Sequence, residues 1–156
     1  MGNGKKEENA FALFSHLTFT HSPILFMADQ ASDAIVVLMT AGSREEAARL
    51  ADMLVVARLA ACVQILPEIE SVYHWQGNVE RAPEILLLAK TTQANFASVE
   101  SAVRALHSYE TPEIIALPVT AASAPYLEWL VANVIPQNKE TIQATVAKAN
   151  GSTQSG

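Results

Sequence analysis

The amino-acid sequence predicts an α+β domain in which two helices cover one face of a four-stranded antiparallel sheet. Three features predict it. The first is a pair of unusually long strand-like segments joined by a tight turn. The second is an apolar strand and a capped helix before this pair, and the third is a helix and a strand after it. Taken in order, these segments give βαββαβ followed by one more helix.

The first predicted strand and helix lie at residues 35–39 and 44–58. Residues 35–39 are a continuous apolar run, which is typical of a strand buried on both faces. Ser43 and Glu46 then form a capping box, in which the serine caps the first turn and the glutamate reaches back toward it. Small and aliphatic residues recur behind this box at helical spacing, so the helix has one apolar face.

The most informative segment is the long strand predicted at residues 61–76, in which apolar and polar residues alternate with period two. Its length of about 15 residues exceeds the usual strand of about 5–6. At about 3.3 Å per residue it spans about 50 Å, more than the width of a small two-layer domain. A strand that extends beyond its own domain needs a cover for its edge, and a second copy of the chain is the expected cover.

The remaining elements complete the sheet. A tight turn at Gly77 and Asn78 leads into the return strand, residues 79–91, where Pro83 marks an edge, a bulge or an interruption. Thr92 is the predicted cap of a second helix, and residues 113–118 form the fourth strand. Ser123 caps a last helix at residues 124–133. The order is that of a ferredoxin-like βαββαβ sandwich with an extended β-hairpin and a C-terminal helix.

The sequence predicts one domain at residues 34–135, between a flexible N-terminal extension at residues 1–33 and a flexible polar tail at residues 136–156. The first 33 residues superficially resemble a secretory signal, but polar residues interrupt their apolar part. We therefore expect a cytoplasmic protein, with a cleaved signal as the second interpretation. The sequence contains no run of 18 apolar residues, which is the length that would indicate a membrane-spanning helix.

Composition narrows the class of partner. The net charge of −6 argues against nucleic acid, which calls for a basic patch. Cys62 is the single cysteine, so the chain has neither an internal disulfide framework nor a cysteine-cluster metal site.

Several motifs together resemble those of the CutA family of divalent-cation tolerance proteins, over about residues 35–134. They are RLAACV at residues 58–63, SVYHWQG at 71–77, HSYETPEI at 107–114 and YLEW at 126–129, with Glu84, Lys90 and Thr91 between them. The resemblance implies a homotrimer whose long hairpins pair across subunits, similar in shape to the PII signalling proteins. It also implies an association with copper tolerance and copper binding.

The resemblance implies two candidate metal ligands, His107 and Met39. The family often has a cysteine where this chain has Met39, and the sequence His-Pro-Tyr where this chain has His-Ser-Tyr. Cu(I) accepts a thioether and an imidazole, so we expect copper or another divalent cation to be bound weakly, with further ligands from other subunits. The alternatives are a helix-capping role for His107 and a core position for Met39.

Further polar and aromatic residues are candidates for a ligand cleft between subunits. Lys90 ends an apolar strand and needs either an ion-pair partner, Glu84 or Glu113, or a ligand. The aromatic residues serve either as packing and interface anchors or as ligand contacts. The full set of cleft candidates is Tyr73, Trp75, Glu84, Lys90, Tyr109, Glu113 and Trp129.

The predicted function is non-catalytic: a trimeric divalent-cation (copper) tolerance protein that binds metal ions and responds to them. The alternatives are a PII-like signalling trimer that binds a small anionic metabolite between subunits, and a structural scaffold. Enzyme functions are disfavoured, because Cys62 has no local activating base. Arg44, which would have to hold a phosphate in an acylphosphatase-like site, instead falls within the capping box.

Overall fold

The four strands form one antiparallel sheet in the order β2-β3-β1-β4. The computed structural model describes residues 33–136 and 139–151, so the expectations for residues 1–32 lie outside the described residues. The strands are β1 (Ala34–Ala41), β2 (Cys62–Trp75), β3 (Asn78–Thr92) and β4 (Ile114–Pro118). The predicted α+β fold, the βαββαβ order and the long hairpin are confirmed.

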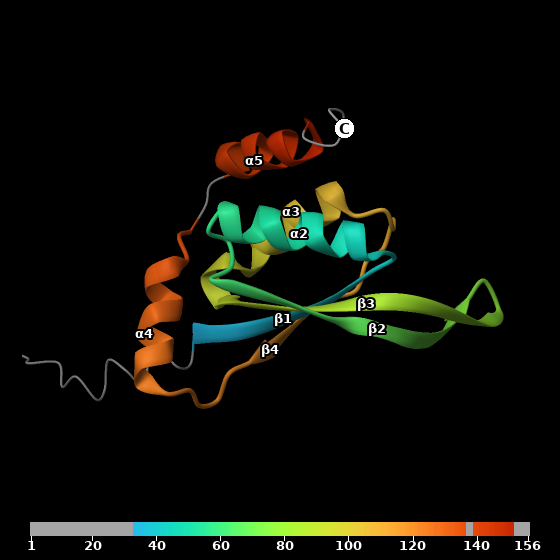
Figure 1. The fold of residues 1–156 in the computed structure, drawn as a ribbon, viewed down its shortest axis with the longest axis horizontal. Coiled ribbons are helices and arrows are strands. Elements are labelled where there is room, and N and C mark those ends of the chain that lie inside the picture. The colour runs from blue at the N-terminus through green and yellow to red at the C-terminus, as the bar shows by residue number, and fades with distance from the viewer. Residues whose placement is uncertain (1–32, 137–138, 152–156) are drawn as a thin grey trace, which may run out of the picture.

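Helices cover one face of this sheet. They are α2 (Arg44–Val56), the short 3₁₀ turn η1 (Gln93–Asn95), α3 (Phe96–Leu106), α4 (Ala124–Asn133) and α5 (Lys139–Gly151). Helices α2 and α3 lie on the sheet, α5 lies outside them, and α4 stands at the end of the sheet where β1 begins (Figure 1). No helix in the described ranges is long and apolar enough to cross a membrane.

The core fills the space between the sheet and the two helices. Val37, Met39 and Leu87 point into it from the sheet and are fully buried. The helices contribute aliphatic residues at helical spacing, such as Leu50 and Leu54 of α2, which are also fully buried. Met39 is therefore a core residue, which is one of the two roles expected from the sequence.

A β-bulge interrupts the alternation of β2. Ile65 pairs with Leu87, but the next pair is Glu68 with Ile85, so β2 has one extra residue there. Before the bulge the odd-numbered residues of β2 face the helices. Beyond it the even-numbered residues do so, because Glu68 is the register partner of Ile85, which faces the helices. The prediction of one uninterrupted alternation was wrong, because an inserted residue reverses which side chains share a face. Pro67, within the bulge, has no N–H to donate to the ladder.

The sheet face opposite α2 and α3 carries no helix over the described residues (Figure 1). We call it the open face. Register places aliphatic side chains across it, and Ile115 and Leu117 of β4 are 47% and 45% exposed. The remaining members are Val36, Leu38, Leu86 and Leu88. The part of the hairpin at residues 68–85, here called the arm, extends beyond the helices.

Two further expectations need correction. Thr92 makes no side-chain cap, because the chain first forms η1 and α3 begins only at Phe96. The tail predicted to be flexible contains α5, and Ile142 of this helix is only 6% exposed. The apolar residues of α5 are few and spaced among polar ones, so the sequence alone held little indication that this segment packs on the domain.

We expect Met39→Ala to lower the free energy of unfolding by about 2–5 kcal/mol, because it removes a fully buried side chain and leaves a cavity. Urea unfolding followed by circular dichroism, at one protein concentration, measures this. Val56→Ala is the control, since Val56 is 72% exposed and its loss should change stability by less than about 0.5 kcal/mol. Similar values for the two variants would contradict the described core.

Candidate functional site

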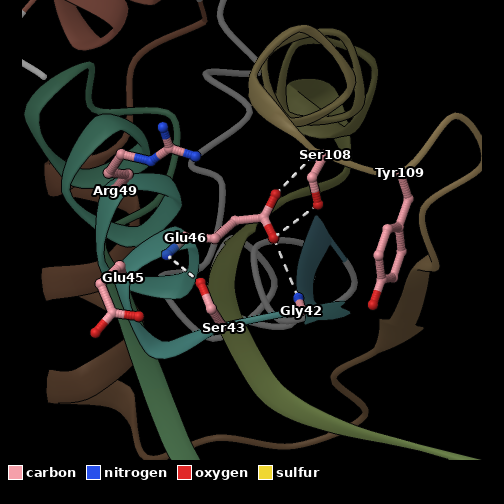
Figure 2. A pocket seen from close by; sticks show the side chains of 7 residues that line it. All are labelled: Gly42, Ser43, Glu45, Glu46, Arg49, Ser108 and Tyr109. Atoms are coloured by element: carbon pink, nitrogen blue, oxygen red, sulfur yellow. Dashed lines mark hydrogen bonds between the residues drawn. The ribbon is translucent and has the colours of Figure 1, made fainter.

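The turn after α3 is tied to two other elements by the buried carboxylate of Glu46 on α2. Its Oε1 accepts a hydrogen bond from the Ser108 backbone N–H at 2.6 Å, and its Oε2 accepts from the Ser108 hydroxyl at 3.0 Å. Oε2 also accepts from the Gly42 N–H at 3.1 Å. Figure 2 shows this side chain crossing from α2 toward Ser108, with Gly42 beneath it. Glu46 therefore joins α2, the end of β1 and the turn.

The hydrogen bonds decide the charge of Glu46. Burial alone would raise the pKa of this carboxyl, but the two hydrogen bonds from Ser108, followed by the neighbouring His107 and the bond from Gly42, outweigh it and lower the pKa below its ordinary value. The capping box predicted part of this: the Ser43 hydroxyl accepts from the Glu46 N–H at 3.1 Å, as expected. The contact with Ser108, 62 residues away, had no local signal in the sequence.

His107 has both ring nitrogens engaged. Nε2 lies 2.8 Å from the carbonyl oxygen of Thr40, and Nδ1 accepts the Tyr109 N–H at 3.0 Å. An Nδ1 that accepts an N–H carries no proton, so the ring is the neutral tautomer protonated at Nε2. The distance of 3.7 Å between Nδ1 and Glu46 Oε1 is then a close contact rather than an ion pair.

The described geometry does not fit the predicted metal ligands His107 and Met39. The His107 side chain is fully buried and both its nitrogens are used, and Met39 is fully buried in the core. Neither offers a free donor atom to an incoming ion. His107 is the C-cap of α3, the structural role that the sequence left open. Within the described residues, no group of three or more His, Cys, Asp or Glu side chains could hold a metal ion.

Tyr109, Glu84 and Tyr73 come together at the root of the arm. The Tyr109 hydroxyl is hydrogen-bonded to Glu84, a buried carboxylate. Burial chiefly, and then the negative charge of Glu84 and its hydrogen bond, raise the pKa of Tyr109. A Cβ atom at Gly42 would lie 3.0 Å from the Tyr109 hydroxyl oxygen, so the glycine gives the ring room to lie there.

An open hollow of about 580 Å³ lies beside this turn. Figure 2 shows Glu46 and Ser108 directed toward each other across it, while Glu45 and Arg49 point away from them. The hollow is lined by Gly42, Ser43, Glu45, Glu46, Arg49, Ser108 and Tyr109. Of its two carboxylates, that of Glu46 already accepts three hydrogen bonds, so this part of the hollow has a structural explanation without a ligand.

Lys90 lies at the other end of the open face. Its ammonium donates to the Gln64 side-chain oxygen and, at 3.3 Å, to the Leu88 carbonyl. Neither expected partner, Glu84 or Glu113, forms an ion pair with it in the described part of the chain. Burial lowers the pKa of this half-buried amine. Lys90 is therefore a cation held by neutral oxygens, with no ion-pair partner among the described residues.

Aromatic residues and the cysteine surround that end of the face. Cys62 is the register partner of Lys90. Burial chiefly, and then the nearby Cys62, raise the pKa of Tyr126 of α4. The rings of Tyr126 and Trp129 are 5.4 Å apart. We call this group the lysine cluster: Cys62, Gln64, Lys90, Tyr126 and Trp129.

The cleft candidates thus fall into separate groups within one chain. Tyr73, Glu84 and Tyr109 form one group, while Lys90 and Trp129 belong to the lysine cluster. Glu84 and Lys90 are six residues apart on β3, which is about 20 Å. Trp75 is 55% exposed near the tip of the arm, and Glu113 is exposed before β4. A single chain does not bring these candidates into one cleft.

Comparison with known proteins identifies the family. A family model described as CutA1 divalent ion tolerance protein matches residues 35–133. The chain belongs to this family. The resemblance noted in the sequence is confirmed, and so is the prediction that this divalent-cation tolerance protein is not an enzyme.

Individual relatives agree. The divalent-cation tolerance protein CutA of Thermus thermophilus is 49% identical over 98 residues, which are 63% of this chain and 95% of the relative. The chloroplastic protein CutA of Arabidopsis thaliana is 44% identical over 117 residues, 75% of this chain but only 64% of the relative. A solved structure of an Archaeoglobus fulgidus CutA is described as periplasmic, so the names of relatives point to different compartments.

Solved CutA structures confirm the fold. The structure from Thermus thermophilus has a TM-score of 0.65 at 47% identity and covers 65% of this chain and 99% of its own. CutA1 from Oryza sativa has a TM-score of 0.67 at 40% identity and covers 69% of this chain and 99% of its own. The βαββαβ sheet of this CutA protein is therefore the fold of its family.

We expect Glu46→Gln to lower stability at pH 7 by about 1–3 kcal/mol, because the amide cannot accept all three donors that the carboxylate accepts. A lowered carboxyl pKa stabilises the fold above the ordinary value of 4.5 and loses this effect as the pH falls through the folded-state pKa. The wild type should therefore lose more stability than the variant between pH 7 and pH 3.

Urea unfolding at several pH values measures this difference. Glu45→Gln is the matched control, because the neighbouring Glu45 is exposed and its carboxylate makes no hydrogen bond to the turn. Parallel acid losses for wild type and Glu46→Gln would show that Glu46 does not anchor the turn.

Proposed function

We propose that this CutA protein acts as a homotrimer that binds a divalent cation, with copper as the leading candidate, at a site shared between subunits. The observation that carries the proposal is the open face. Aliphatic side chains of β1, β3 and β4 lie on it, and no helix of the described residues covers them. Contiguous apolar surface of this kind marks an association site, and the arm beside it is the segment for which the sequence already required a second copy.

The functional residues support assembly between subunits for a separate reason. Tyr73, Glu84 and Tyr109 lie at one end of the open face, and the lysine cluster lies at the other. An arm about as long as the sheet itself, laid across a neighbouring subunit, would bring residues of one end close to the other end of its neighbour. A ligand bound between subunits would then be contacted by both groups.

Copper needs donors other than the predicted pair. Since His107 and Met39 are engaged in the core, the proposed metal is held by side chains on the open face, contributed by more than one subunit. Cys62 lies on this face beside Lys90 and is partly exposed. Its sulfur is the soft type of donor that Cu(I) prefers.

Lys90 supports a second candidate, the PII-like signalling trimer that binds a small anionic metabolite. Within the described part of the chain its half-buried ammonium has neutral oxygens as its hydrogen-bond partners, and an anion would supply the missing negative charge. Tyr126 and Trp129 offer aromatic surface nearby. The proposed compartment is the cytoplasm, and the segment that would hold a cleaved signal lies outside the described residues.

We expect the purified protein to have three times the chain mass of 16.8 kDa in gel filtration coupled to light scattering. Leu117→Glu should shift the mass toward a single chain, because it places a charge on the open face. Val56→Glu, on the exposed side of α2, is the matched control and should keep the mass of the wild type. A wild-type protein with the mass of one chain at micromolar concentration would refute the proposal.

Calorimetric titration with Cu(I), Cu(II), Zn(II) and a nucleotide panel tests the ligand. We expect copper affinity to fall at least tenfold in Cys62→Ser and to stay within twofold of wild type in folded His107→Gln. A large loss in folded His107→Gln would instead restore the histidine as a ligand. Copper binding that survives Cys62→Ser would remove the thiol from the proposal.

The same titration separates the second candidate. Nucleotide binding that is lost in Lys90→Met but retained in Lys90→Arg would favour the metabolite-binding trimer over the metal-binding one, because arginine keeps the positive charge.

A further inference from the structure

Helix α5 lies outside the part of the chain that the family shares. The family match ends at residue 133, and α5 begins at Lys139. In the Thermus thermophilus structure, 65% of this chain accounts for 99% of the relative. The shared architecture is therefore complete in a relative whose chain leaves no room for α5, and the surface under α5 does not need this helix in order to form.

The helix packs on the outer surface of the helical layer, chiefly on α3 and also on α2 (Figure 1). Ile142 is 6% exposed and joins the main core, and Val146 and Ala149 pack against it half-buried. These three residues recur at intervals of four and three, so they form one stripe on one face of the helix. Exposed residues such as Gln143 lie on the other face.

This contact is narrow for a helix of 13 residues. Its stripe has one large aliphatic residue, one valine and one alanine. A helix of about 12–15 residues or fewer is marginal on its own in water, so α5 depends on this stripe to stay folded. Only five residues separate it from α4, so its local concentration at the surface is high. Tethering therefore compensates for a narrow contact, and an untethered helix with a larger apolar stripe can compete with it.

We propose that the outer surface of α2 and α3 beneath α5 is a docking site for an amphipathic helix of a partner protein, and that α5 holds this site closed in cis. The structure already seats a helix there, which defines what the site accepts: aliphatic side chains at positions i, i+4 and i+7. A partner with leucine at the last two positions buries more apolar surface than Val146 and Ala149 do. Such a helix competes with α5 although it lacks the tether.

The test uses a fluorophore-labelled peptide of residues 139–151 that carries Val146→Leu and Ala149→Leu, followed by fluorescence anisotropy. It is titrated with the wild-type chain, with Ile142→Asp, and with Gln143→Asp as the matched control on the exposed face of α5. A chain that ends at residue 136 is the second open form. We expect the peptide to bind Ile142→Asp and the shortened chain at least tenfold more tightly than wild type and Gln143→Asp.

Several outcomes would overturn the proposal. One is equal affinity of the peptide for wild type and Ile142→Asp, and another is no binding to either open form at millimolar concentration. Circular dichroism reports whether the open forms fold; if the shortened chain alone fails to fold, Ile142→Asp decides. Unfolding of both would show that α5 is an integral part of this domain rather than a detachable cover. A peptide that also carries Ile142→Asp should not bind any of the chains.

Discussion

The bulge between Ile65 and Glu68 determines what the hairpin arm presents to its surroundings. One extra residue reverses which side chains lie on each face of a strand. The odd-numbered residues of β2 therefore face the helices before the bulge and the opposite side beyond it. Near the domain, Val63 and Ile65 pack into the core under the helices. Beyond the bulge, Tyr73 and Trp75 share the face of Glu84, on the side away from the helices. Without the bulge, the two aromatic residues would lie on the opposite side of the arm, away from Tyr109 and the open face.

The open face and the turn after α3 depend on each other. Tyr109 reaches Glu84 at the root of the arm, and its backbone N–H is held by His107, whose ring in turn contacts Thr40 of β1. Glu46 of α2 accepts a hydrogen bond from the backbone N–H of Ser108, which lies between His107 and Tyr109 in this turn. The buried polar groups here are mutually satisfied, which rigidifies the turn. The phenol that faces the arm is thus positioned by a network whose carboxylate and imidazole are already hydrogen-bonded within the protein.

Local signals in the sequence were sufficient for most of the fold. The apolar run at residues 35–39, the capping box at Ser43 and Glu46, and the period-two pattern of the hairpin each act over a few residues, and each predicted the right element. What the sequence did not reveal depends on contacts between distant residues. Glu46 is hydrogen-bonded to Ser108 across 62 positions, and α5 packs on the domain through Ile142, Val146 and Ala149. The bulge was only partly predictable. Pro67 is a local signal in the sequence, but a proline alone does not show whether a strand is interrupted, ends or bulges.

The motifs that identify the family divide by the role they have within one chain. Arg58 adopts a left-handed conformation after α2, with φ of 55°, and its guanidinium donates to the carbonyls of Ala132 and Asn133 at the end of α4. His107 caps α3 and binds Thr40. Lys90 has no comparable structural role, because among the described residues its half-buried ammonium donates to neutral oxygens. Trp75 is largely exposed on the arm. The proposed assembly and ligand site rest on these two motif residues, which have no such role within one chain. They lie on the open face and the arm, away from the buried turn.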